Sequence, residues 1–567
     1  MLHSSFDQSY RLGKKTVSGR FAIPSGIRCT NASTIRKCFA EVPSIGVVTT
    51  KSISFEPRKG YREPIYAHYA PGCYINAVGL SNPGAERFLA ELAGIEIPED
   101  KFLLVSIFGS DLESFLAAAR TLAPAADGFE LNMSCPHAKG YGAEVGQDPE
   151  LLGKITAAIA GGFDVPVFVK LSAIHPALVE AARGAIASGA AGITVTNTIG
   201  PALSAIFEEE PILSNQAGGL SGDGIRPLGL RAVQQIRKAI GDGPVIIGMG
   251  GIASANHVRQ YASGGADLFG IGSALTGLDS RQMARYFEDL QSELVSGKPG
   301  PAHQCSCDSR LPMDYTKTRI ASKTEYGPSF FKLVLESLPG DYDDGDLAGK
   351  FFFLCLPGIG EKPFAILSAR EKSVIVRVVG EFTRRLAELP IGAEMLLRGP
   401  YGAGVPEFEN STLVFVGGGT GIASILEIAR KLSRRGNKIV FLLGARSSEQ
   451  LFDLDRFESL GEVQAATDDG SAGLEGYAPD LLAPAIARMT PEERGRIAFI
   501  DCGPEPMVRK CFEIERQFAS EDRIVASIEY VTSCGVGICG KCSSPSGALT
   551  CIDGPFLPWR EFSADGK

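Results

Sequence analysis

The stretch FLLVSIFG at residues 102–109 decides the class of fold, because it is an apolar run of strand length that ends in a glycine. Near-continuous apolar runs are typical of strands in a parallel sheet that is covered by helices on its faces. Amphipathic helical segments, such as residues 148–160 and 225–240, separate it from further runs of the same kind. Those runs are GFELNMS (128–134), PVFVKLS (166–172), GITVTN (192–197), PVIIGMGG (244–251) and LFGIGSAL (268–275).

Two more candidate strands, around Ala22 and Val47, extend the pattern over roughly 300 residues, which fits an α/β fold of the (β/α)8 TIM-barrel type. An open doubly wound sheet is the competing architecture. Polar residues and glycines gather at the C-terminal ends of the strands, where such barrels carry their chemistry. GMGGI (248–252) and GIGSAL (270–275) predict a phosphate site there, because glycines let backbone N–H groups approach an anion. Ordinary turn glycines are the alternative.

The sequence changes in character after residues 298–312, which read as a linker. Short strands without long helices, from FKLVLESL (331–338) to MLLRGPYG (395–402), predict a small antiparallel β-barrel. From Thr412 the alternation of strand and helix returns, which predicts a nucleotide-binding α/β domain. We therefore expect four domains, at residues 1–300, 313–406, 407–522 and 523–567.

Four of the 13 cysteines fall close together in the C-terminal segment SCGVGICGKC…TC. They are Cys534, Cys539, Cys542 and Cys551. The first three have the C-x4-C-x2-C spacing of plant-type [2Fe–2S] ferredoxins, and a fourth cysteine follows later. Zinc sites usually pair two short C-x2–4-C hairpins, so the spacing favours an iron–sulfur cluster over a zinc site or free thiols.

VFVGGGTGIASI (414–425) reads as a strand, a glycine turn and a helix start, the geometry that places a pyrophosphate on a helix N-terminus. It departs from the GxGxxG spacing, and a tight turn is the alternative reading. Its position between a small barrel and CGPEPM (502–507) resembles the ferredoxin-reductase pattern of a flavin barrel followed by a nicotinamide domain. That resemblance implies FAD contacts at Lys362, Pro363, Phe364, Ala365, Gly380 and Thr383, and NAD contacts at Gly418, Gly419, Thr420, Gly421, Cys502 and Gly503. Lys362 and Ala365 stand where that family usually has an arginine and a serine, so the contacts with the flavin ring must differ.

Cys135 lies just past a predicted strand end, in ELNMSCPHAKGYG (130–142). A buried cysteine is most often a small hydrophobic residue. Here amide and hydroxyl side chains surround it in the expected barrel mouth, and two lysines from other strands point to a bound anion or an electron-rich ring. The surrounding residues are Lys51, Asn132, Ser134, Lys170, Asn197 and Thr198. Together they favour a catalytic cysteine.

Residues 20–275 resemble the cytosolic, cysteine-base class of dihydroorotate dehydrogenases. Residues 324–556 resemble the electron-transfer subunit, with FAD and [2Fe–2S], that accompanies the NAD-linked members as a separate chain; here the two are fused. The resemblance implies Cys135 as the catalytic base and substrate contacts at Lys51, Asn76, Gly79, Leu80, Asn132, Asn197 and Thr198. It implies FMN contacts at Ser25, Gly26, Lys51, Ser52, Asn132, Lys170, Gly222, Gly250, Gly251, Gly272 and Ser273. The four C-terminal cysteines are its implied cluster ligands.

The activity implied by this resemblance is oxidation of dihydroorotate to orotate in de novo pyrimidine biosynthesis, with electrons passing from FMN to [2Fe–2S] to FAD to NAD⁺. His137 stands where many members have asparagine and where dihydropyrimidine dehydrogenases often have histidine. An NAD(P)H-dependent reductase of uracil or thymine is therefore the alternative. The loop NAVGLSN (76–82) favours dihydroorotate, because it matches the loop that captures a carboxylate. Arg446 follows a predicted strand and could meet the 2′-phosphate of NADP, so the sequence does not decide between NAD and NADP.

Net charge and hydrophobicity limit the kinds of partner that the chain can bind. The chain of 567 residues has a net charge of only −9 and no basic run, which argues against a nucleic-acid partner. It has neither an apolar stretch of about 18 residues, which a membrane span needs, nor the apolar core of a signal peptide. We therefore expect a cytoplasmic enzyme whose partners are small molecules and which forms, by analogy with the family, a homodimer through the barrel.

Overall fold

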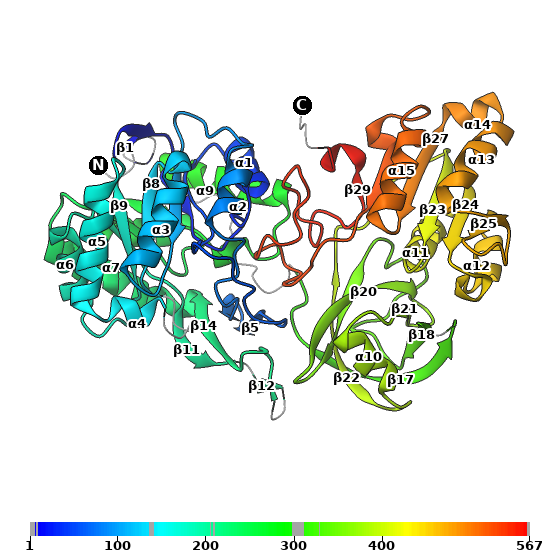
Figure 1. The fold of residues 1–567 in the computed structure, drawn as a ribbon, viewed down its shortest axis with the longest axis horizontal. Helices are drawn as coiled ribbons and strands as arrows, with labels where there is room; N and C mark the ends of the chain where they lie inside the picture. Colours follow the sequence, from blue (N-terminus) through cyan, green and yellow to red (C-terminus); the bar gives the residue numbers. More distant parts are fainter. Residues whose placement is uncertain are drawn as a thin grey trace. The chain divides into compact units, whose positions relative to one another are not determined.

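The computed structural model describes residue 6 and residues 9–134, 141–204, 206–207, 210–297, 311–327 and 329–563. The chain divides into two compact units, coloured blue to green and green to red in Figure 1. Met1–Arg310 with Val536–Lys541 form the first, and Leu311–Gly535 with Cys542–Lys567 form the second. Most of the predicted linker, residues 298–310, lies outside the described residues.

Eight parallel strands of the described first unit close into a barrel, in the order β3-β4-β7-β8-β9-β10-β15-β16. Phe269 of β16 pairs with Phe21 of β3 and closes the ring, so the predicted TIM barrel is confirmed and the open sheet is excluded. The strands are β3 (Phe21–Ile23), β4 (Ile45–Thr49), β7 (Phe102–Ile107), β8 (Gly128–Asn132), β9 (Val167–Leu171), β10 (Gly192–Val195), β15 (Val245–Met249) and β16 (Leu268–Gly270). The predicted strand at 268–275 is shorter than expected, because its second half forms a 3-10 turn at Ser273–Leu275.

Amphipathic helices surround the barrel, and polar caps start several of them. Asp111 accepts a hydrogen bond from Ser114 N and starts α3, and Asp148 in the same way starts α5. Such caps satisfy backbone N–H groups that the first helical turn leaves unpaired. The helices are α1 (Ala32–Glu41), α2 (Ala85–Leu92), α3 (Leu112–Leu122), α4 (Ala143–Gly146), α5 (Pro149–Gly162), α6 (Leu178–Ala187), α7 (Arg226–Ile240), α8 (Ala255–Ser263) and α9 (Ser280–Ser296).

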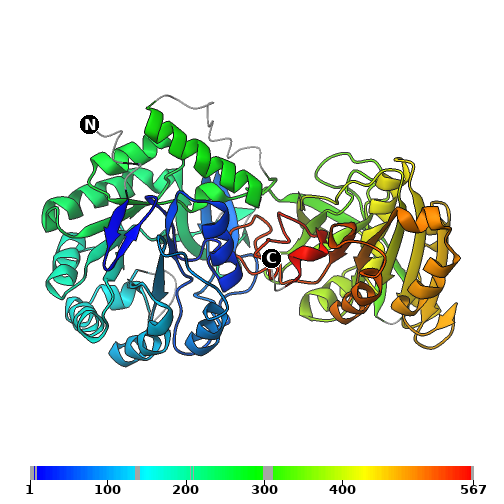
Figure 2. The same cartoon turned by 90° about the horizontal axis from the view of Figure 1, so that it is seen from above.

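A small hairpin covers the N-terminal end of the barrel. Its strands are β1 (Tyr10–Leu12) and β2 (Lys15–Val17), and Figure 2 shows them in dark blue across the barrel. Leu12 and Val17 pack in one apolar cluster with interior side chains such as Phe102 and Phe168. Closing this end excludes water there and leaves the opposite end open for chemistry.

The long connections after β4 and β10 pair into a four-stranded sheet that the sequence did not predict. Its order is β11-β14-β6-β5, with β5 (Tyr66–Ala70), β6 (Cys73–Asn76), β11 (Ile199–Leu203) and β14 (Ala217–Gly222). A further hairpin, β12 (Ile206–Phe207) and β13 (Glu210–Pro211), lies between β11 and β14 in the chain. Asn76 pairs with Gly219 across this sheet, which holds the start of the NAVGLSN loop.

The second unit begins with the predicted antiparallel barrel, of order β17-β18-β21-β20-β19-β22. Alternate apolar side chains of its strands, among them Leu333, Phe352 and Val376, fill its interior. The strands are β17 (Thr316–Glu325), β18 (Phe330–Leu335), β19 (Phe351–Leu356), β20 (Gly360–Ser368), β21 (Ser373–Arg377) and β22 (Glu394–Tyr401), and helix α10 (Glu381–Glu388) follows β21.

A mainly parallel sheet follows, of order β26-β25-β24-β23-β27-β28-β29, and confirms the expected α/β nucleotide-binding fold. Helices cover both of its faces, each over a buried apolar cluster. Its strands are β23 (Thr412–Gly418), β24 (Lys438–Ala445), β25 (Glu462–Thr467), β26 (Leu474–Glu475), β27 (Ile497–Cys502), β28 (Ile524–Ser527) and the antiparallel β29 (Leu557–Pro558). Its helices are α11 (Gly421–Ser433), α12 (Leu454–Glu458), α13 (Leu482–Arg488), α14 (Pro491–Gly495) and α15 (Glu505–Glu515).

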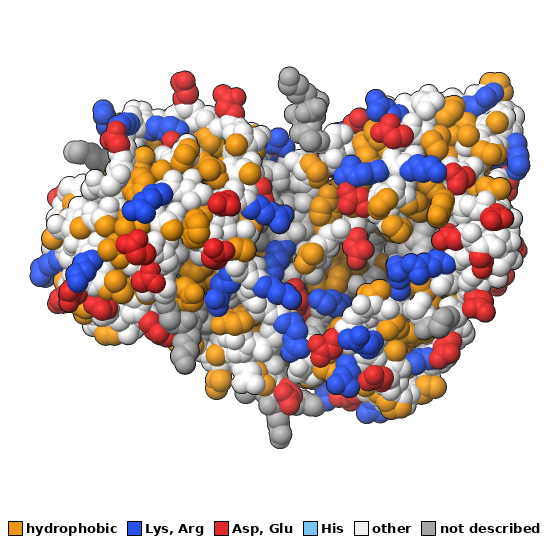
Figure 3. Space-filling model, in the orientation of Figure 1, with side chains coloured by type: hydrophobic (Ala, Val, Ile, Leu, Met, Phe, Trp, Pro, Cys, Tyr) orange, Lys and Arg blue, Asp and Glu red, His pale blue; other side chains and the backbone are white. Residues whose placement is uncertain are grey.

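Two surface properties bear on partners. No helix in the described part of the chain combines the length and the apolar character that crossing a membrane requires. On the face of the first unit drawn in Figure 3, basic and acidic side chains are interspersed.

Candidate active site

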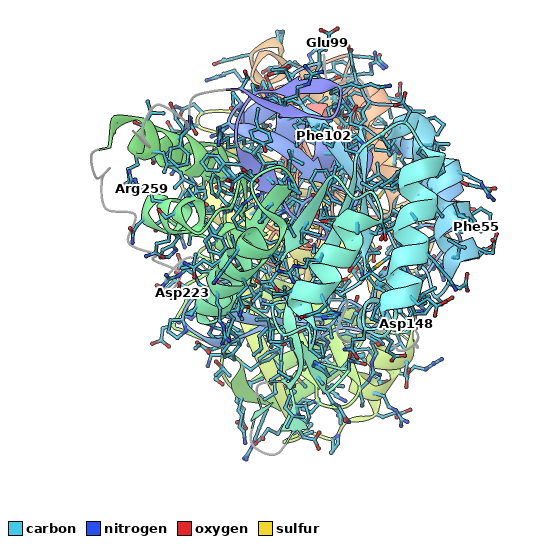
Figure 4. The ribbon with its side chains drawn as sticks, turned by 90° about the vertical axis from the view of Figure 1, so that its left-hand side faces the viewer. Phe55, Glu99, Phe102, Asp148, Asp223 and Arg259 are labelled. Atoms are coloured by element: carbon cyan, nitrogen blue, oxygen red, sulfur yellow. The ribbon has the colours of Figure 1, made fainter. Side chains whose placement is uncertain are left out.

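The candidate site of the first unit lies at the C-terminal ends of the barrel strands. Figure 4 separates the two ends: Glu99, shortly before β7, and Phe102, its first residue, lie in the upper part of the view, and Asp148 and Asp223, which follow strands, lie lower. The side chains that were predicted from sequence lie at the C-terminal ends of β3, β4, β8, β9 and β10 or just beyond them. The barrel topology therefore brings together residues that are far apart in the chain.

A hydrogen-bonded chain of hydroxyl and amide groups joins three of these strand ends. Ser52 Oγ lies 3.0 Å from Ser25 Oγ and 2.9 Å from Ser106 Oγ, and it accepts a hydrogen bond of 2.9 Å from Asn132 Nδ2. Ser52 and Asn132 are 2% and 5% exposed, so these bonds are shielded from water and fix the side-chain positions. The sequence predicted Ser25, Ser52 and Asn132, but not Ser106.

The same network continues to β10 through Asn197. Its Nδ2 donates to Ser134 Oγ at 3.0 Å and to Asn132 Oδ1 at 3.4 Å. Its Oδ1 accepts a hydrogen bond of 2.8 Å from the backbone N–H of Thr198, which fixes the orientation of the amide. Two predicted substrate contacts, Asn132 and Asn197, therefore form one rigid polar wall.

A buried ion pair lies next to this wall. Lys170 Nζ is 3.5 Å from Glu130 Oε1, with side-chain exposures of 4% and 0%. Ser106 donates to the same carboxylate oxygen at 3.0 Å, whereas Glu130 Oε2 has no partner among the described residues. Glu130 was missed in the sequence because it stands inside an apolar strand. The feature that could have revealed it is the single acidic residue in GFELN, at a position whose side chain faces the barrel interior.

Lys51 lies beside the first predicted flavin turn. A Cβ atom added to Gly26 would stand 3.5 Å from Lys51 Nζ, an ordinary contact distance, so the ammonium group lies against this turn. The backbone N–H of Lys51 donates to Cys29 O at 2.9 Å. The Cys29 thiol accepts a hydrogen bond from Gly26 N at 3.1 Å, and burial raises its pKa to about 11, so this thiol stays protonated.

The NAVGLSN loop is tied to the segment that follows Lys51 and Ser52. Asn82 Nδ2 donates to Ser54 Oγ at 3.0 Å, and Arg58 Nε donates to the carbonyl of Gly79 at 2.9 Å. Leu80 is buried against Phe108 and has a left-handed backbone, with φ of 54°. This sharp turn is the segment that was predicted from sequence to bind the substrate carboxylate.

Glycines bring the loop ends of the predicted phosphate region close together. A Cβ atom on Gly251 would stand 2.6 Å from Gly222 O, so both backbones pass at a distance that only glycine permits. Tyr261 donates its hydroxyl hydrogen to Gly250 O at 2.7 Å. Gly272 precedes the 3-10 turn that Ser273 starts, and a Cβ atom there would contact Pro24 at 3.4 Å. These glycines and the N–H groups of a helical turn fit a phosphate.

In the second unit, the predicted FAD residues lie on β20 and at the start of α10. Lys362, Pro363, Phe364 and Ala365 belong to β20. Thr383 Oγ1 accepts from Val379 N at 3.0 Å and Gly380 N at 3.1 Å, and the space beside Gly380 is open to 4 Å. An open helix N-terminus of this kind fits a pyrophosphate.

The predicted NAD residues converge at the C-terminal ends of two adjacent strands, β23 and β27. A Cβ atom on Gly421 would stand 2.1 Å from Cys502 O, and Cβ atoms on Gly418 and Gly503 would both collide with Met507. Gly419 has no atom within 4 Å of its Cβ position, and Thr420 stands at the N-cap position of α11 without a side-chain capping hydrogen bond. Burial raises the pKa of Cys502 to about 11, which keeps this thiol neutral. Arg446 is exposed directly after β24.

The four cysteines of the C-terminal motif are all buried, at 1–6% exposure. The thiols of Cys534 and Cys542 are within hydrogen-bonding reach of Cys551, which raises the pKa of Cys551 well above its ordinary value. Thr550 donates its N–H and its hydroxyl to Cys542 O at 3.0 and 3.1 Å. Within the second unit, the buried thiols of Cys534, Cys542 and Cys551 have the chemistry of metal-cluster ligands, and Cys539 belongs to the first unit. Cys135, the predicted base, lies outside the described residues.

Comparison with known proteins identifies the first unit. The family model described as dihydroorotate dehydrogenase matches residues 11–294. A catalytic subunit of dihydroorotate dehydrogenase B (NAD⁺) from Pyrococcus horikoshii is 42% identical over 253 residues, covering 45% of this chain and 81% of that protein. Its counterpart from Methanopyrus kandleri is 37% identical over 259 residues, covering 45% and 81%. The chain belongs to the dihydroorotate dehydrogenase family.

As a member of this family the chain is an oxidoreductase, and the predicted resemblance of its first part is confirmed. The model of an oxidoreductase NAD-binding domain matches residues 415–512, which include the predicted nucleotide turn. A solved structure of an NADH-dependent reduced ferredoxin–NADP oxidoreductase is 26% identical and covers 44% of this chain and 90% of its own. Its TM-score of 0.38 is too low to support an argument about fold.

Proposed function

We propose that this chain oxidises dihydroorotate to orotate, a reaction of de novo pyrimidine biosynthesis, and transfers the electrons to NAD⁺ within one polypeptide. The observation that carries the proposal is the polar wall of Ser52, Asn132 and Asn197 at the mouth of a family barrel, on a chain that also carries an NAD-binding domain. The relatives named above are catalytic subunits of NAD⁺-dependent enzymes.

The chain's own residues bind and orient the substrate in this proposal. The amides of Asn132 and Asn197 bind the polar edges of the pyrimidine ring, together with Lys51, Asn76 and Thr198. Backbone N–H groups at Gly79 and Leu80 bind the carboxylate, which uracil lacks. Cys135 takes the proton from the ring carbon next to the carbonyl group, and it needs its thiolate form to do so.

Three resident redox groups fit the arrangement. The barrel residues from Ser25 to Ser273 would hold FMN, with Lys170 near its ring. β20 and the start of α10 would hold FAD, and Cys534, Cys539, Cys542 and Cys551 would hold a [2Fe–2S] cluster. When bound, the flavins exchange electron pairs with the substrate and NAD⁺, and the cluster carries single electrons between them.

Further expectations belong to the same proposal. The domain limits are those predicted, with the cluster at 523–567, and the chain is a cytoplasmic homodimer paired through the barrel. The second candidate function is NAD(P)H-dependent reduction of uracil or thymine, which His137 favours. NAD rather than NADP is the proposed acceptor.

The test is anaerobic addition of dihydroorotate to the purified, coloured protein, followed by NAD⁺. We expect the flavin absorbance to bleach and NADH then to appear in proportion to the substrate consumed. A Cys539→Ser variant should bleach its first flavin but form no NADH, whereas Cys355→Ser, a buried cysteine of the small barrel, should behave like the wild type. The second candidate function replaces the first if dihydroorotate does not reduce the oxidised flavin and uracil reoxidises protein that NADH has reduced.

A further inference from the structure

Three groups with metal-binding chemistry meet in the core of the nucleotide-binding sheet, on the side of α15. One carboxylate oxygen each from Asp501 and Glu515 and the sulfur of Cys511 all lie within 4.8 Å of one another. All three residues are 0% exposed. None of them belongs to the candidate active site or to the C-terminal cysteine motif.

The local sequence explains why these groups converge. Cys511 and Glu515 are four residues apart on α15 and so lie on one face of that helix. On β27 the side chains alternate, and Ile497 and Phe499 pack into the apolar cluster that also contains Cys511. Asp501 occupies the next position of that alternation, so an acid points where the pattern calls for an apolar residue.

The two carboxyl groups have no partner but each other among the described residues. All four of their oxygens are buried, and none has a hydrogen-bond donor among the described residues. Glu427, another buried acid of the same domain, shows the contrast. It accepts hydrogen bonds from Gly345 N at 2.6 Å, Ala369 N at 3.2 Å and Arg430 Nη1 at 2.8 Å. An unpartnered buried carboxylate is costly, and a second one beside it raises the cost.

Two arrangements relieve that cost. In the first, the carboxyl groups share protons with each other, and burial does raise the pKa of Asp501 to about 8. Even with a proton on each carboxyl group, the two acids satisfy only each other and leave the Cys511 sulfur unused. In the second, a cation binds all three side chains and neutralises most of their charge. The cation therefore satisfies more of the buried acceptor atoms.

We infer that Asp501, Cys511 and Glu515 form a buried structural site for one divalent transition-metal ion, with zinc as the best match. A thiolate sulfur together with carboxylate oxygens is a donor set that zinc accepts, at about 2.0–2.3 Å per ligand. Calcium and magnesium prefer oxygen donors alone. With one carboxylate bidentate and the other monodentate, three oxygens and one sulfur complete a four-coordinate shell without water, which is the character of a structural rather than a catalytic zinc site.

Such an ion has a clear structural consequence. It crosslinks β27 to the last turn of α15, and the connection between these elements starts at Cys502, the last residue of β27, and continues through Gly503. That turn contacts the glycine loop after β23, since Gly421 lies against Cys502 O. The ion therefore stiffens one wall of the nucleotide site and takes no part in electron transfer.

The experiment is elemental analysis and zinc-edge X-ray absorption of the full-length protein with its flavins and iron in place. We expect about one zinc ion per chain beside the iron, bound by one sulfur and otherwise by oxygen. The Asp501→Asn/Glu515→Gln double variant should lose this zinc and keep its iron. Glu427→Gln, the matched control in the same domain, should retain both metals.

Three results would overturn the inference. If the wild-type protein contains no metal besides iron, even after incubation with zinc sulfate, the two carboxyl groups are stabilised by shared protons and not by a cation. An absorption spectrum with four sulfur ligands places any zinc at the C-terminal cysteines. Zinc that survives in the double variant lies elsewhere. If the double variant does not fold, the wild-type spectrum still decides, and none of these readouts depends on dihydroorotate turnover.

Discussion

Asn132 Nδ2 donates a hydrogen bond of 2.9 Å to Ser52 Oγ, and this bond joins the end of β8 to the segment that follows β4. Ser52 also touches Ser25 and Ser106, so its hydroxyl group is shared by four strand ends of the barrel. The orientation of the Asn132 amide, and through it that of Asn197, therefore depends on one serine.

Replacing Ser52 with alanine should slow dihydroorotate-dependent flavin reduction about tenfold to a hundredfold. The change leaves a buried amide N–H without an acceptor, which costs about 1–3 kcal/mol, and each 1.4 kcal/mol corresponds to about a factor of ten in rate. Anaerobic stopped-flow absorbance measures it. Thr121→Ala, which removes only a hydroxyl bonded to the α3 carbonyl of Ala117, is the control. An unchanged rate for Ser52→Ala would show that the network does not orient the substrate.

Replacing Lys170 with methionine should destabilise the barrel by about 3–5 kcal/mol, because it leaves the Glu130 carboxylate buried without its counter-ion. The Lys170→Met/Glu130→Gln double variant should recover much of that loss, since both charges are gone. Denaturant unfolding, with the flavin content measured in parallel, tests this. Lys15→Met removes an ion pair with Asp127 that is 27% and 22% exposed, and it should cost about 0–1 kcal/mol. Equal losses for Lys170→Met and the double variant would contradict the coupling.

Replacing Cys135 with alanine should abolish dihydroorotate-driven bleaching while the protein keeps its flavin. In the wild type the bleaching rate should rise with pH through the thiol pKa, near 8.5 for an ordinary cysteine, because the thiolate is the active form. Cys29→Ala is the control: burial raises the pKa of Cys29 to about 11, so its loss should leave the pH profile unchanged. The assignment of the base fails if Cys29→Ala removes the pH dependence and Cys135→Ala does not.

The sequence predicted the elements whose patterns are local. Apolar runs such as residues 102–109 became barrel strands because burial on both faces demands continuous hydrophobicity, and the glycine turn after β23 gave the nucleotide domain. The four-stranded sheet was missed because its strands are short and of mixed polarity, as in YAHYA and AGGLSG. The pairing that stabilises them joins Asn76 to Gly219, and no local sequence pattern predicts a contact between residues so far apart in the chain.

Buried charges were missed for a related reason. Glu130 and Asp501 each stand in an apolar strand, and the hydrophobic pattern around them hides the acid. The role of each acid depends on side chains from other parts of the chain. Glu130 lies near Lys170, and Asp501 lies near Cys511 and Glu515. A single acid inside an apolar strand is thus the signal that points to a buried functional or metal-binding group.

Replacing Gly421 with alanine should impair NAD⁺ reduction and spare the reaction in the barrel. The new Cβ atom would stand 2.1 Å from Cys502 O, so the start of α11 and the end of β27 must move apart where the nucleotide is proposed to bind. We expect dihydroorotate to bleach the first flavin at the wild-type rate, and NADH formation to fall about tenfold or more, as the loss of about 1.4 kcal/mol of nucleotide binding requires. Gly495→Ala lies in α14 of the same domain with no atom within 4 Å of the new Cβ, and it should leave both reactions unchanged. Normal NADH formation in Gly421→Ala would place the nucleotide away from this turn, and slowed bleaching of the first flavin would mean that the two reactions are not separable in the way proposed.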